Sequence, residues 1–308
     1  MTLLTICLIA AAILAALPFL AEALRTPVTR AMQDRAPGRI ADLSQGRTHY
    51  RWHGPENGEV AVCIHGLSTP SYVFAATERS LAALGYRVLS YDLYGRGFSD
   101  RVSGPQNADF FLAQLRDLLR QQHVSGEVTV LGFSMGAQIA TAFAAEDGTR
   151  VKALILAAPA GVSAKTGQPK NALWLAPLIG DWLTRIAGGW ALRRELVEHH
   201  NIPTIIPDLE DRQAVETRMR GFLPALLSSR RHLLKASLLP DLTRVARQEI
   251  PILALWGTED PIVPLSAMGT LAQAAPDAHH GQISGAGHNL LQTHPAQIAD
   301  HLTKFLRD

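Results

Sequence analysis

The sequence predicts an α/β protein with a mostly parallel central sheet, helices on both faces of that sheet and an inserted helical cap. Short apolar runs typical of strands alternate with longer segments of helical spacing from residue 47 onward. Several of these runs are apolar at nearly every position, as expected for strands that are covered on both faces. Of the 308 residues, 47% are hydrophobic and 18% are charged, which excludes a disordered chain, a collagen and a polytopic membrane protein.

The elements follow one another in a regular order. Each expected strand is a short apolar or alternating run, and these runs are 47–53, 60–65, 86–92, 127–133, 151–158, 252–256 and 279–283. The intervening segments place apolar residues at helical spacing and predict helices at 71–84, 107–123, 135–145, 266–274 and 295–307. The strand signal stops between residues 160 and 248, where a Leu-rich segment carries three of the five tryptophans.

We therefore expect five segments along the chain. They are an anchor at 1–24, a polar linker at 25–45, a first core part at 46–159, a helical cap insertion at 160–248 and a second core part at 249–308. The linker is assigned from its arginines and from Pro27 and Pro37.

The N-terminal segment is expected to cross a membrane once. Residues 1–21 carry no charge, and the run is long enough to span about 30 Å of hydrocarbon as a helix. The alternative is a cleaved signal peptide, because Ala21-Glu22-Ala23 resembles a cleavage site, although the run does not open with a basic residue. Four arginines (Arg25, Arg30, Arg35 and Arg39) follow the segment and favour a cytoplasmic body. Cleavage would instead give a secreted or periplasmic protein.

Composition argues against two classes of ligand. The net charge of +2 and the 6% of aromatic residues give no reason to expect a nucleic acid partner. The two cysteines, Cys7 and Cys63, lie in the apolar N-terminus and in an expected core strand, and no cysteine or histidine spacing typical of a metal site is present. We expect two buried, inert thiols and no metal.

The motif that indicates chemistry is Gly132-Phe133-Ser134-Met135-Gly136. This G-x-S-x-G pattern follows an expected strand and opens an expected helix, which is the context that a nucleophilic serine requires. Small residues must flank the serine because the turn is tight, and the helix N-terminus favours developing negative charge. Ser134 is therefore the expected nucleophile.

A serine hydroxyl needs a base, and the base needs an orienting acid. His288 follows the strand 279–283 in a Gly-rich loop, whereas His279 and His280 lie inside that strand and His294 precedes the last helix. Glu259 and Asp260 both follow the strand 252–256, and we favour Asp260 because neighbouring residues point in different directions. Ser134, Asp260 and His288 all lie at the carboxyl ends of expected strands, where catalytic groups gather in open α/β sheets.

An oxyanion hole is expected beside the serine. A tetrahedral intermediate needs two N–H donors, and the backbone N–H groups of Met135 and Leu67 are the candidates. His65, before Gly66, is expected to organise the loop and not to carry protons. Ser68 could either contact substrate or hold the turn.

These motifs resemble the α/β-hydrolase superfamily over residues 46–308. The resemblance is carried by His65-Gly66, by the stretch from Asp92 to Ser99, by Gly132–Gly136, by 257–264 and by 285–288. It implies that Asp92 and Arg96 organise a loop, that the cap falls at 160–248, and that acyl transfer to water proceeds without metal or organic cofactor. Relatives that dehalogenate or open epoxides carry aspartate at the position of Ser134.

Within that superfamily the chain is most similar to membrane-anchored monoacylglycerol lipases and bacterial carboxylesterases. The elbow, Pro159-Ala160-Gly161 and the N-terminal segment carry this resemblance, although Ala137 stands where many relatives have glycine. It implies a small acyl ester or lipid as substrate. The alternative is a C–C hydrolase of meta-cleavage products, but such enzymes usually have Gly-Pro-Gly where this chain has Leu67-Ser68-Thr69, and asparagine where it has Phe133.

The cap adds candidate substrate contacts. An apolar stripe at helical spacing includes Trp174 and Trp182, and most of it is expected to form the core of the cap itself. With Ser68 and Phe133, these two tryptophans are the expected substrate-binding residues. A catalytically silent, membrane-tethered binding protein is the remaining alternative, and such proteins usually lose a member of the triad.

Overall fold

An eight-stranded sheet forms the centre of the structure, a computed structural model that describes residues 2–163, 172–197 and 204–307. The strand order is β1-β2-β4-β3-β5-β6-β7-β8. β2 is antiparallel to both of its neighbours, and all other neighbouring pairs are parallel, so the predicted sheet is confirmed. The strands are β1 (Arg39–Asp42), β2 (Arg47–His53), β3 (Val60–Ile64), β4 (Arg87–Tyr91), β5 (Val128–Phe133), β6 (Val151–Ala157), β7 (Ile252–Gly257) and β8 (His279–Ile283).

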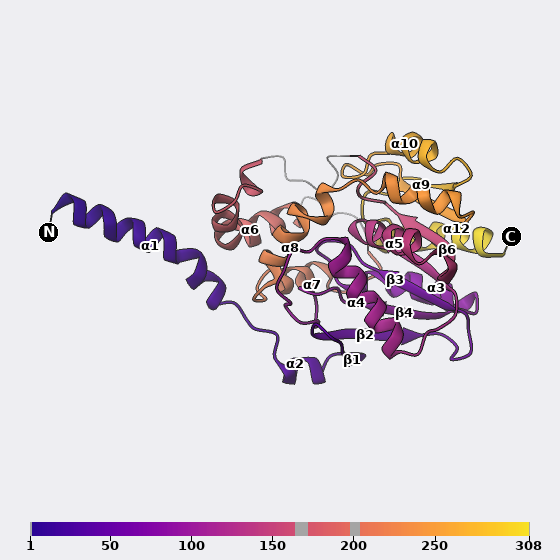
Figure 1. Cartoon of the computed structure of the whole chain (residues 1–308), viewed down its shortest axis with the longest axis horizontal. Helices are drawn as coiled ribbons and strands as arrows, with labels where there is room; N and C mark the ends of the chain where they lie inside the picture. The colour runs from indigo at the N-terminus through magenta and orange to yellow at the C-terminus, as the bar shows by residue number, and fades with distance from the viewer. Residues whose placement is uncertain (1, 164–171, 198–203, 308) are drawn as a thin grey trace.

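Helices cover both faces of this sheet (Figure 1). One face carries α4 (Ala108–Gln121), α5 (Met135–Glu146), α9 (Leu239–Arg247) and α10 (Ala267–Ala274). The other face carries α3 (Ala75–Ala83), α11 (Leu290–Thr293) and α12 (Pro295–Arg307). Because β5 and β7 lie between these two layers, every residue of both strands is buried.

Local signals in the sequence explain where α4 begins and which face it buries. The Asn107 side-chain oxygen accepts the N–H of Phe110 at 3.0 Å and caps the helix. Phe111, Leu115 and Leu118 then recur at helical spacing and are fully buried against the sheet. Burying each of these side chains contributes about 1.5–3 kcal/mol.

The cap consists mainly of α6 (Ile179–Val197), α7 (Leu209–Glu216) and α8 (Phe222–Arg231). Leu192, Met219 and Phe222 belong to a small separate core within it, and Leu67 of the sheet domain packs against that core. The last helix of the predicted insertion, α9, packs on the sheet domain beside α5 and α10. Short 3-10 helices complete the chain at Ser71–Phe74, Gly148–Arg150, Ala172–Trp174 and Leu233–Lys235.

The interval 25–45, which the sequence predicts to be a linker, contains α2 (Arg30–Asp34) and β1. β1 gives no strand signal because Ala41 is its one buried residue, so hydrophobic alternation is absent. Thr26 forms a parallel bridge with Met219 of the cap. The interval is therefore bound to both the sheet and the cap.

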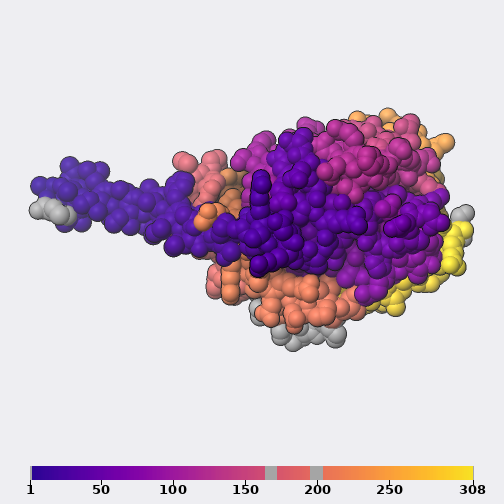
Figure 2. Space-filling model, turned by 90° about the horizontal axis from the view of Figure 1, so that it is seen from below, coloured from indigo at the N-terminus to yellow at the C-terminus, as the bar shows by residue number. Residues whose placement is uncertain are grey.

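The N-terminal helix α1 (Leu3–Ala23) projects from one end of the body (Figures 1 and 2). Within the described chain it is the one helix whose length and apolar composition would allow it to cross a membrane. Most of its side chains are exposed, and Pro18 is the one residue of the helix that is buried. The expectation of two buried thiols is therefore wrong for Cys7, which is exposed on this projecting helix, whereas Cys63 is buried.

Candidate active site

Ser134 lies on the turn between β5 and α5, in a backbone conformation that side chains rarely adopt. Its φ is 53° and its ψ is −116°. A Cβ at Gly136 would lie 2.0 Å from the carbonyl oxygen of Ile64, and one at Gly132 would lie 2.4 Å from the carbonyl oxygen of Gly136. The two glycines are therefore required by close backbone approach. The unusual backbone conformation of Ser134 itself costs about 1–3 kcal/mol, and it persists because the surrounding structure enforces it.

The structure brings Ser134, His288 and Asp260 into one chain of hydrogen bonds. His288 Nε2 lies 2.9 Å from Ser134 Oγ, and His288 Nδ1 lies 2.8 Å from Asp260 Oδ2. Asp260 Oδ1 accepts the N–H groups of Ile262 at 2.8 Å and Val263 at 2.9 Å. An ionised carboxylate only accepts hydrogen bonds, so Nδ1 carries the proton and Nε2 is left to accept from the serine hydroxyl.

The other acids and imidazoles singled out in the sequence lie apart from this chain. Glu259 is exposed, and Asp260 is the neighbour that meets His288. His279 packs against Phe305, His280 bonds to Trp256, and His294 bonds to Thr293.

His65 fixes the loop that follows β3. Leu93 donates its N–H to His65 Nε2 at 2.9 Å, so His65 Nδ1 carries the proton and donates to the carbonyl oxygen of Gly66 at 2.8 Å. In a trans peptide the N–H points opposite to the carbonyl, so the N–H of Leu67 points away from His65. Burial lowers the pKa of His65 to about 4, which keeps the ring neutral at pH 7.

Two backbone donors are available near the nucleophile. Leu67 follows Gly66, whose Cβ position would lie 3.2 Å from Ser134 Cβ, and Met135 is the first residue of α5. Among the described residues, neither the Leu67 N–H nor the Met135 N–H has an acceptor. N–H groups without an internal partner beside a nucleophile can hold a developing oxyanion.

Arg96 holds the same loop from its other side. Its guanidinium is buried, and Nε donates to the carbonyl oxygen of Leu67 at 3.0 Å. Its second terminal nitrogen donates to the Ser229 hydroxyl of α8 at 2.7 Å. Burial lowers the pKa of Arg96 to about 9, and the group stays charged at pH 7. The Arg96 guanidinium therefore bonds both to the cap and to the Leu67 loop.

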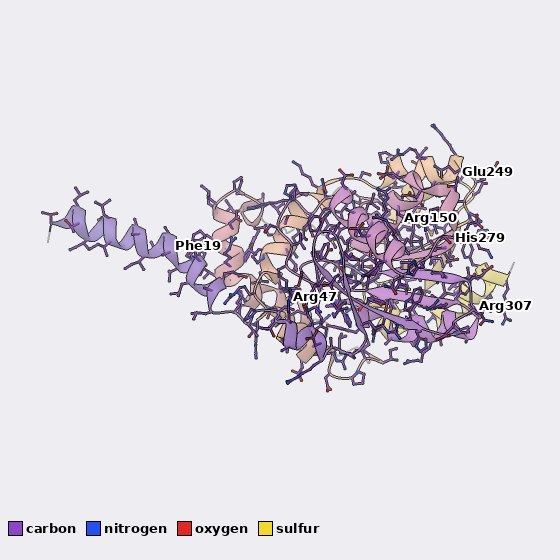
Figure 3. All side chains as sticks on the ribbon, turned by 60° about the horizontal axis from the view of Figure 1, so that its bottom comes forward. Phe19, Arg47, Arg150, Glu249, His279 and Arg307 are labelled. Atoms are coloured by element: carbon purple, nitrogen blue, oxygen red, sulfur yellow. The ribbon has the colours of Figure 1, made fainter. Side chains whose placement is uncertain are left out.

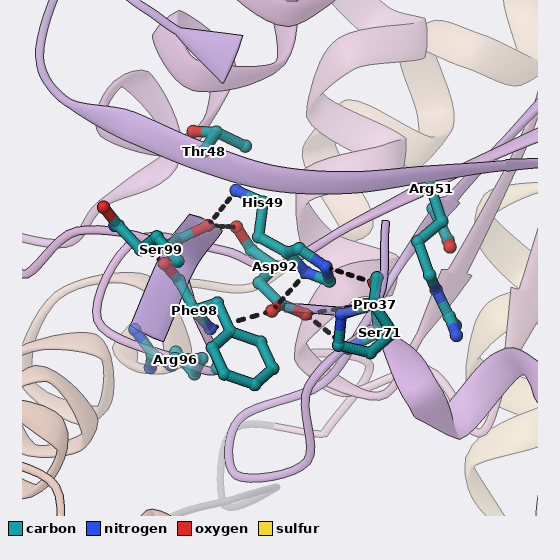
Figure 4. A network of polar contacts seen from close by, with 12 residues as sticks. Pro37, Thr48, His49, Arg51, Ser71, Asp92, Arg96, Phe98 and Ser99 are labelled. Atoms are coloured by element: carbon teal, nitrogen blue, oxygen red, sulfur yellow. Dashed lines mark hydrogen bonds and ion pairs between the residues drawn. The ribbon is translucent and has the colours of Figure 1, made fainter. Parts of the chain in front are cut away.

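Asp92 organises the chain around the end of β4 (Figure 4). Its carboxylate accepts the N–H and hydroxyl of Ser71 at 2.9 and 2.6 Å, the N–H of Phe98 at 3.0 Å and His49 Nδ1 at 2.8 Å. Burial would raise the pKa of Asp92, but the hydrogen bond and charge of His49 outweigh it and hold that pKa well below its usual range. His49, which the sequence analysis did not identify, has its own pKa raised, because Asp92 outweighs the lowering effect of burial.

The four expected substrate-binding residues lie in different places. The Phe133 ring is buried and its centroid lies 5.5 Å from that of His288, and Ser68 is half-buried on the loop after Leu67. Trp174 is half-buried in its 3-10 helix. Trp182 faces α1, because its indole N–H donates to the carbonyl oxygen of Leu14 at 2.8 Å. Phe133 is therefore the candidate that contacts the His288 ring.

A buried carboxylate at the base of the cap was missed by sequence reasoning. Glu216, at the end of α7, accepts the N–H of Gly97 at 3.1 Å. Burial raises its pKa to about 7, although the positive charge of Arg101 opposes this effect. Its position in a short polar helix gave no signal, because burial there depends on how the cap sits on the sheet.

The described residues hold no cluster of three or more His, Cys, Asp or Glu side chains that could bind a metal ion. Comparison with known families gives a match to the alpha/beta hydrolase fold over residues 60–295. The protein belongs to the α/β-hydrolase family. The match covers β3 to α11 and includes Ser134, Asp260 and His288.

Individual relatives are distant. An uncharacterized protein of Mycobacterium bovis is 27% identical over 267 residues, which covers 81% of this chain and 76% of the relative. The 2-hydroxy-6-oxononadienedioate/2-hydroxy-6-oxononatrienedioate hydrolase of Cupriavidus pinatubonensis is 26% identical over 84% of this chain and 91% of its own. The crystal structure of a membrane phospholipase A described as a bacterial virulence factor has a TM-score of 0.73 at 20% identity. It covers 99% of this chain and 96% of its own, so the match includes most of α1.

Proposed function

We propose that the protein is a serine hydrolase that cleaves carboxylic esters through a Ser134–His288–Asp260 triad. The observation that carries the proposal is the chain of hydrogen bonds from Ser134 Oγ to His288 Nε2 and from Nδ1 to Asp260 Oδ2. The tight turn at Ser134 and the neutral His65 beside the Leu67 loop support it.

In the proposed mechanism His288 takes the hydroxyl proton as Ser134 Oγ attacks the ester carbonyl. Asp260 holds the ring in the required tautomer and stabilises the imidazolium that forms. The N–H groups of Leu67 and Met135 stabilise the oxyanion. His288 then protonates the leaving alcohol, and water cleaves the acyl-enzyme by the same route in reverse.

The substrate class that we propose is a monoacylglycerol or a similar acyl ester of a membrane. Two observations support this choice: the apolar helix α1 and the match of nearly the whole chain to a membrane phospholipase A. Each acyl methylene buried on binding contributes about 0.8 kcal/mol, so an apolar acyl chain supplies binding energy without charged contacts.

Labelling and turnover together test the reaction. The detergent-solubilised full chain is treated with a fluorophosphonate probe and assayed with short p-nitrophenyl esters and with monoacylglycerols. The wild type should be labelled and active, and Ser134→Ala should lose both properties. A folded wild-type protein that the probe does not label favours a binding protein, and an active Ser134→Ala variant rejects the triad.

Hydrolysis of a C–C bond in a meta-cleavage product is the second candidate. The curated hydrolase of Cupriavidus pinatubonensis, which matches 84% of this chain, favours it. Parallel product analysis with a dienone ring-cleavage product and with monoacylglycerol separates the two reactions. An esterase should release fatty acid from monoacylglycerol and leave the C–C bond of the dienone intact, whereas a C–C hydrolase should do the reverse.

We also propose that α1 stays in the mature protein as a single-pass anchor with the body in the cytoplasm. The Glu22 carboxylate accepts hydrogen bonds from the N–H of Gly221 and from Arg25, and cleavage after Ala23 would remove it. The arginines after α1 favour the cytoplasmic orientation. Intact mass of the membrane fraction tests retention, and a reporter fused to the C-terminus tests orientation. Loss of the first residues would instead indicate a secreted or periplasmic protein.

A further inference from the structure

The cap lies against the C-terminal half of α1. The Trp182 indole donates to the carbonyl oxygen of Leu14 at 2.8 Å, and the Arg185 guanidinium lies 6.0 Å from the centre of the Phe19 ring. Leu14 is about 14 Å along the helix axis from Ala23. The rest of α1 extends away from the body (Figures 1 and 3).

This contact restricts how α1 can sit in a membrane. The whole helix of 21 residues is about 31 Å long, which matches the hydrocarbon thickness of about 30 Å. If the cap stayed entirely in water, only the part of α1 before Leu14 would be free to enter the bilayer, a length of about 16 Å. That length is close to half of the hydrocarbon core. A fully inserted α1 therefore carries part of α6 into the membrane.

The exposed face of α6 suits that position. Leu178 is 84% exposed and Trp190 is 60% exposed, and Ile179 and Ile186 are also exposed. Trp182, Ile186 and Trp190 are each four residues apart, so they lie on one side of α6, and Leu178 immediately precedes the first residue of the helix. Leu178 also lies beyond Trp182 in the direction of the α1 N-terminus, because Trp182 contacts Leu14 whereas Arg185 contacts Phe19.

Two charged side chains of α6 lie near its exposed residues: Asp181 is paired, and the Arg194 guanidinium lies 5.7 Å from the centre of the Trp190 ring. Asp181 pairs with Arg185 at 3.3 Å and with Arg231 at 2.8 Å. Arg218 and Arg220 are exposed beside the end of α1, where Arg220 donates to the carbonyl oxygen of Ala23. Exposed arginines at this level would meet anionic headgroups.

We propose that the start of the cap helix, formed by the exposed Leu178 and Ile179 and here called the α6 face, is embedded among the acyl chains of the leaflet on the body's side, while Ile186 and Trp190 lie toward the headgroups. The occupant is lipid, because the face continues the apolar surface of α1 and ends near a group of arginines. This inference rests on the proposal that α1 is an anchor, and it makes the cap itself a membrane-embedded element.

A fluorescent label reports the position of the α6 face without depending on activity. Cys7 is exposed on the free part of α1 and takes an environment-sensitive label such as NBD, whereas Cys63 is buried. A second protein carries Cys7→Ala with Leu178→Cys, and a matched control carries Cys7→Ala with Asp277→Cys. Asp277 is exposed and lies close in sequence to His279, at the opposite end of the body from Phe19 (Figure 3).

Each full-length protein is reconstituted into vesicles of phosphatidylethanolamine and phosphatidylglycerol, with and without doxyl groups on the acyl chains. We expect the label at position 178 to lose about the same fraction of its emission to the doxyl groups as the label at Cys7, and the label at position 277 to lose none. Equal behaviour at 178 and 277 overturns the inference while Cys7 still reports the anchor. The label at 178 could instead report an apolar environment that doxyl lipid does not quench and that increases with protein density. That result would indicate contact with a second copy of the chain, and it also overturns the inference. Loss of quenching at Cys7 rejects the anchor itself, and none of these readouts depends on whether the ester reaction occurs.

Discussion

Arg96 Nε donates a hydrogen bond to the carbonyl oxygen of Leu67 across 3.0 Å. The same side chain bonds to Ser229 of the cap, so one buried cation joins the cap to the loop that carries a proposed oxyanion donor. A displacement of the cap would therefore move Arg96 and, through it, the backbone at Leu67.

Replacing this cation should slow the reaction. Arg96→Met removes the bond to Leu67 and leaves its carbonyl oxygen without this donor, and a displacement near 1 Å at a catalytic group can cost about 10²-fold in rate. We expect kcat for a short ester to fall by about that factor, with a smaller change in KM. Arg79→Met, on the exposed surface of α3, is the matched control. An Arg96→Met variant that folds and retains full kcat contradicts the proposed link.

The identity of the orienting acid can be decided with two neighbouring substitutions. Asp260→Asn should lower kcat by about 10⁴-fold, because an amide favours the wrong tautomer of His288. Glu259→Gln should leave kcat unchanged, because Glu259 is exposed and Asp260 is the one that contacts His288. Steady-state kinetics on p-nitrophenyl esters measure both. Comparable losses in the two variants would reject the assignment of Asp260.

Glu216 should make the stability of the fold depend on pH. Its folded pKa of about 7 lies above the ordinary value of 4.5, chiefly because it is buried, with Asp92 adding to the effect and Arg101 and Arg96 opposing it. The native state therefore holds the proton to higher pH than the unfolded chain does. The resulting stability is complete below pH 4.5 and is lost as the pH rises through 7.

Glu216→Gln removes this loss because glutamine does not ionise. At pH 8 the variant should be more stable than the wild type by up to about 3 kcal/mol, and the difference should shrink toward pH 4.5. Urea unfolding of the detergent-solubilised protein at both pH values measures it. A variant that is less stable than the wild type at pH 8 would show that the carboxylate is needed there.

Two glycine substitutions should have opposite effects. Gly136→Ala places a Cβ 2.0 Å from the carbonyl oxygen of Ile64, so the elbow and the end of β3 must move apart. We expect loss of activity and a lower melting temperature. Gly269→Ala, on α10, meets nothing within 4 Å and should stabilise the protein by up to about 1 kcal/mol. Thermal unfolding and the esterase assay report both, and an active, equally stable Gly136→Ala variant would mean that the turn can relax.

The sheet was predictable from sequence because its strands are apolar runs between helices of regular spacing. The strand from Val128 and the helix from Met135 frame Ser134, and this local context was sufficient to identify the elbow. β1 was not predictable, because a strand with one buried residue in an Arg-rich stretch has no periodic signal.

The residues of the candidate site also fall into those that the sequence identified and those that it did not. Ser134, His288 and Asp260 follow strands and could be selected by position, and the structure brings them within hydrogen-bond distance. Trp182 was selected for substrate from its helical stripe, but it contacts Leu14, because periodicity does not tell which neighbour a helix face meets. Glu216 was missed for the same reason.

The contacts of α1 are formed between segments far apart in the chain. Trp182 donates to the carbonyl oxygen of Leu14, 168 positions earlier, and the N–H of Gly221 donates to the Glu22 carboxylate, 199 positions earlier. The N-terminal helix is therefore synthesised long before the cap exists. If it enters the bilayer during translation, the cap must complete its fold at the membrane surface, against a helix that is already inserted.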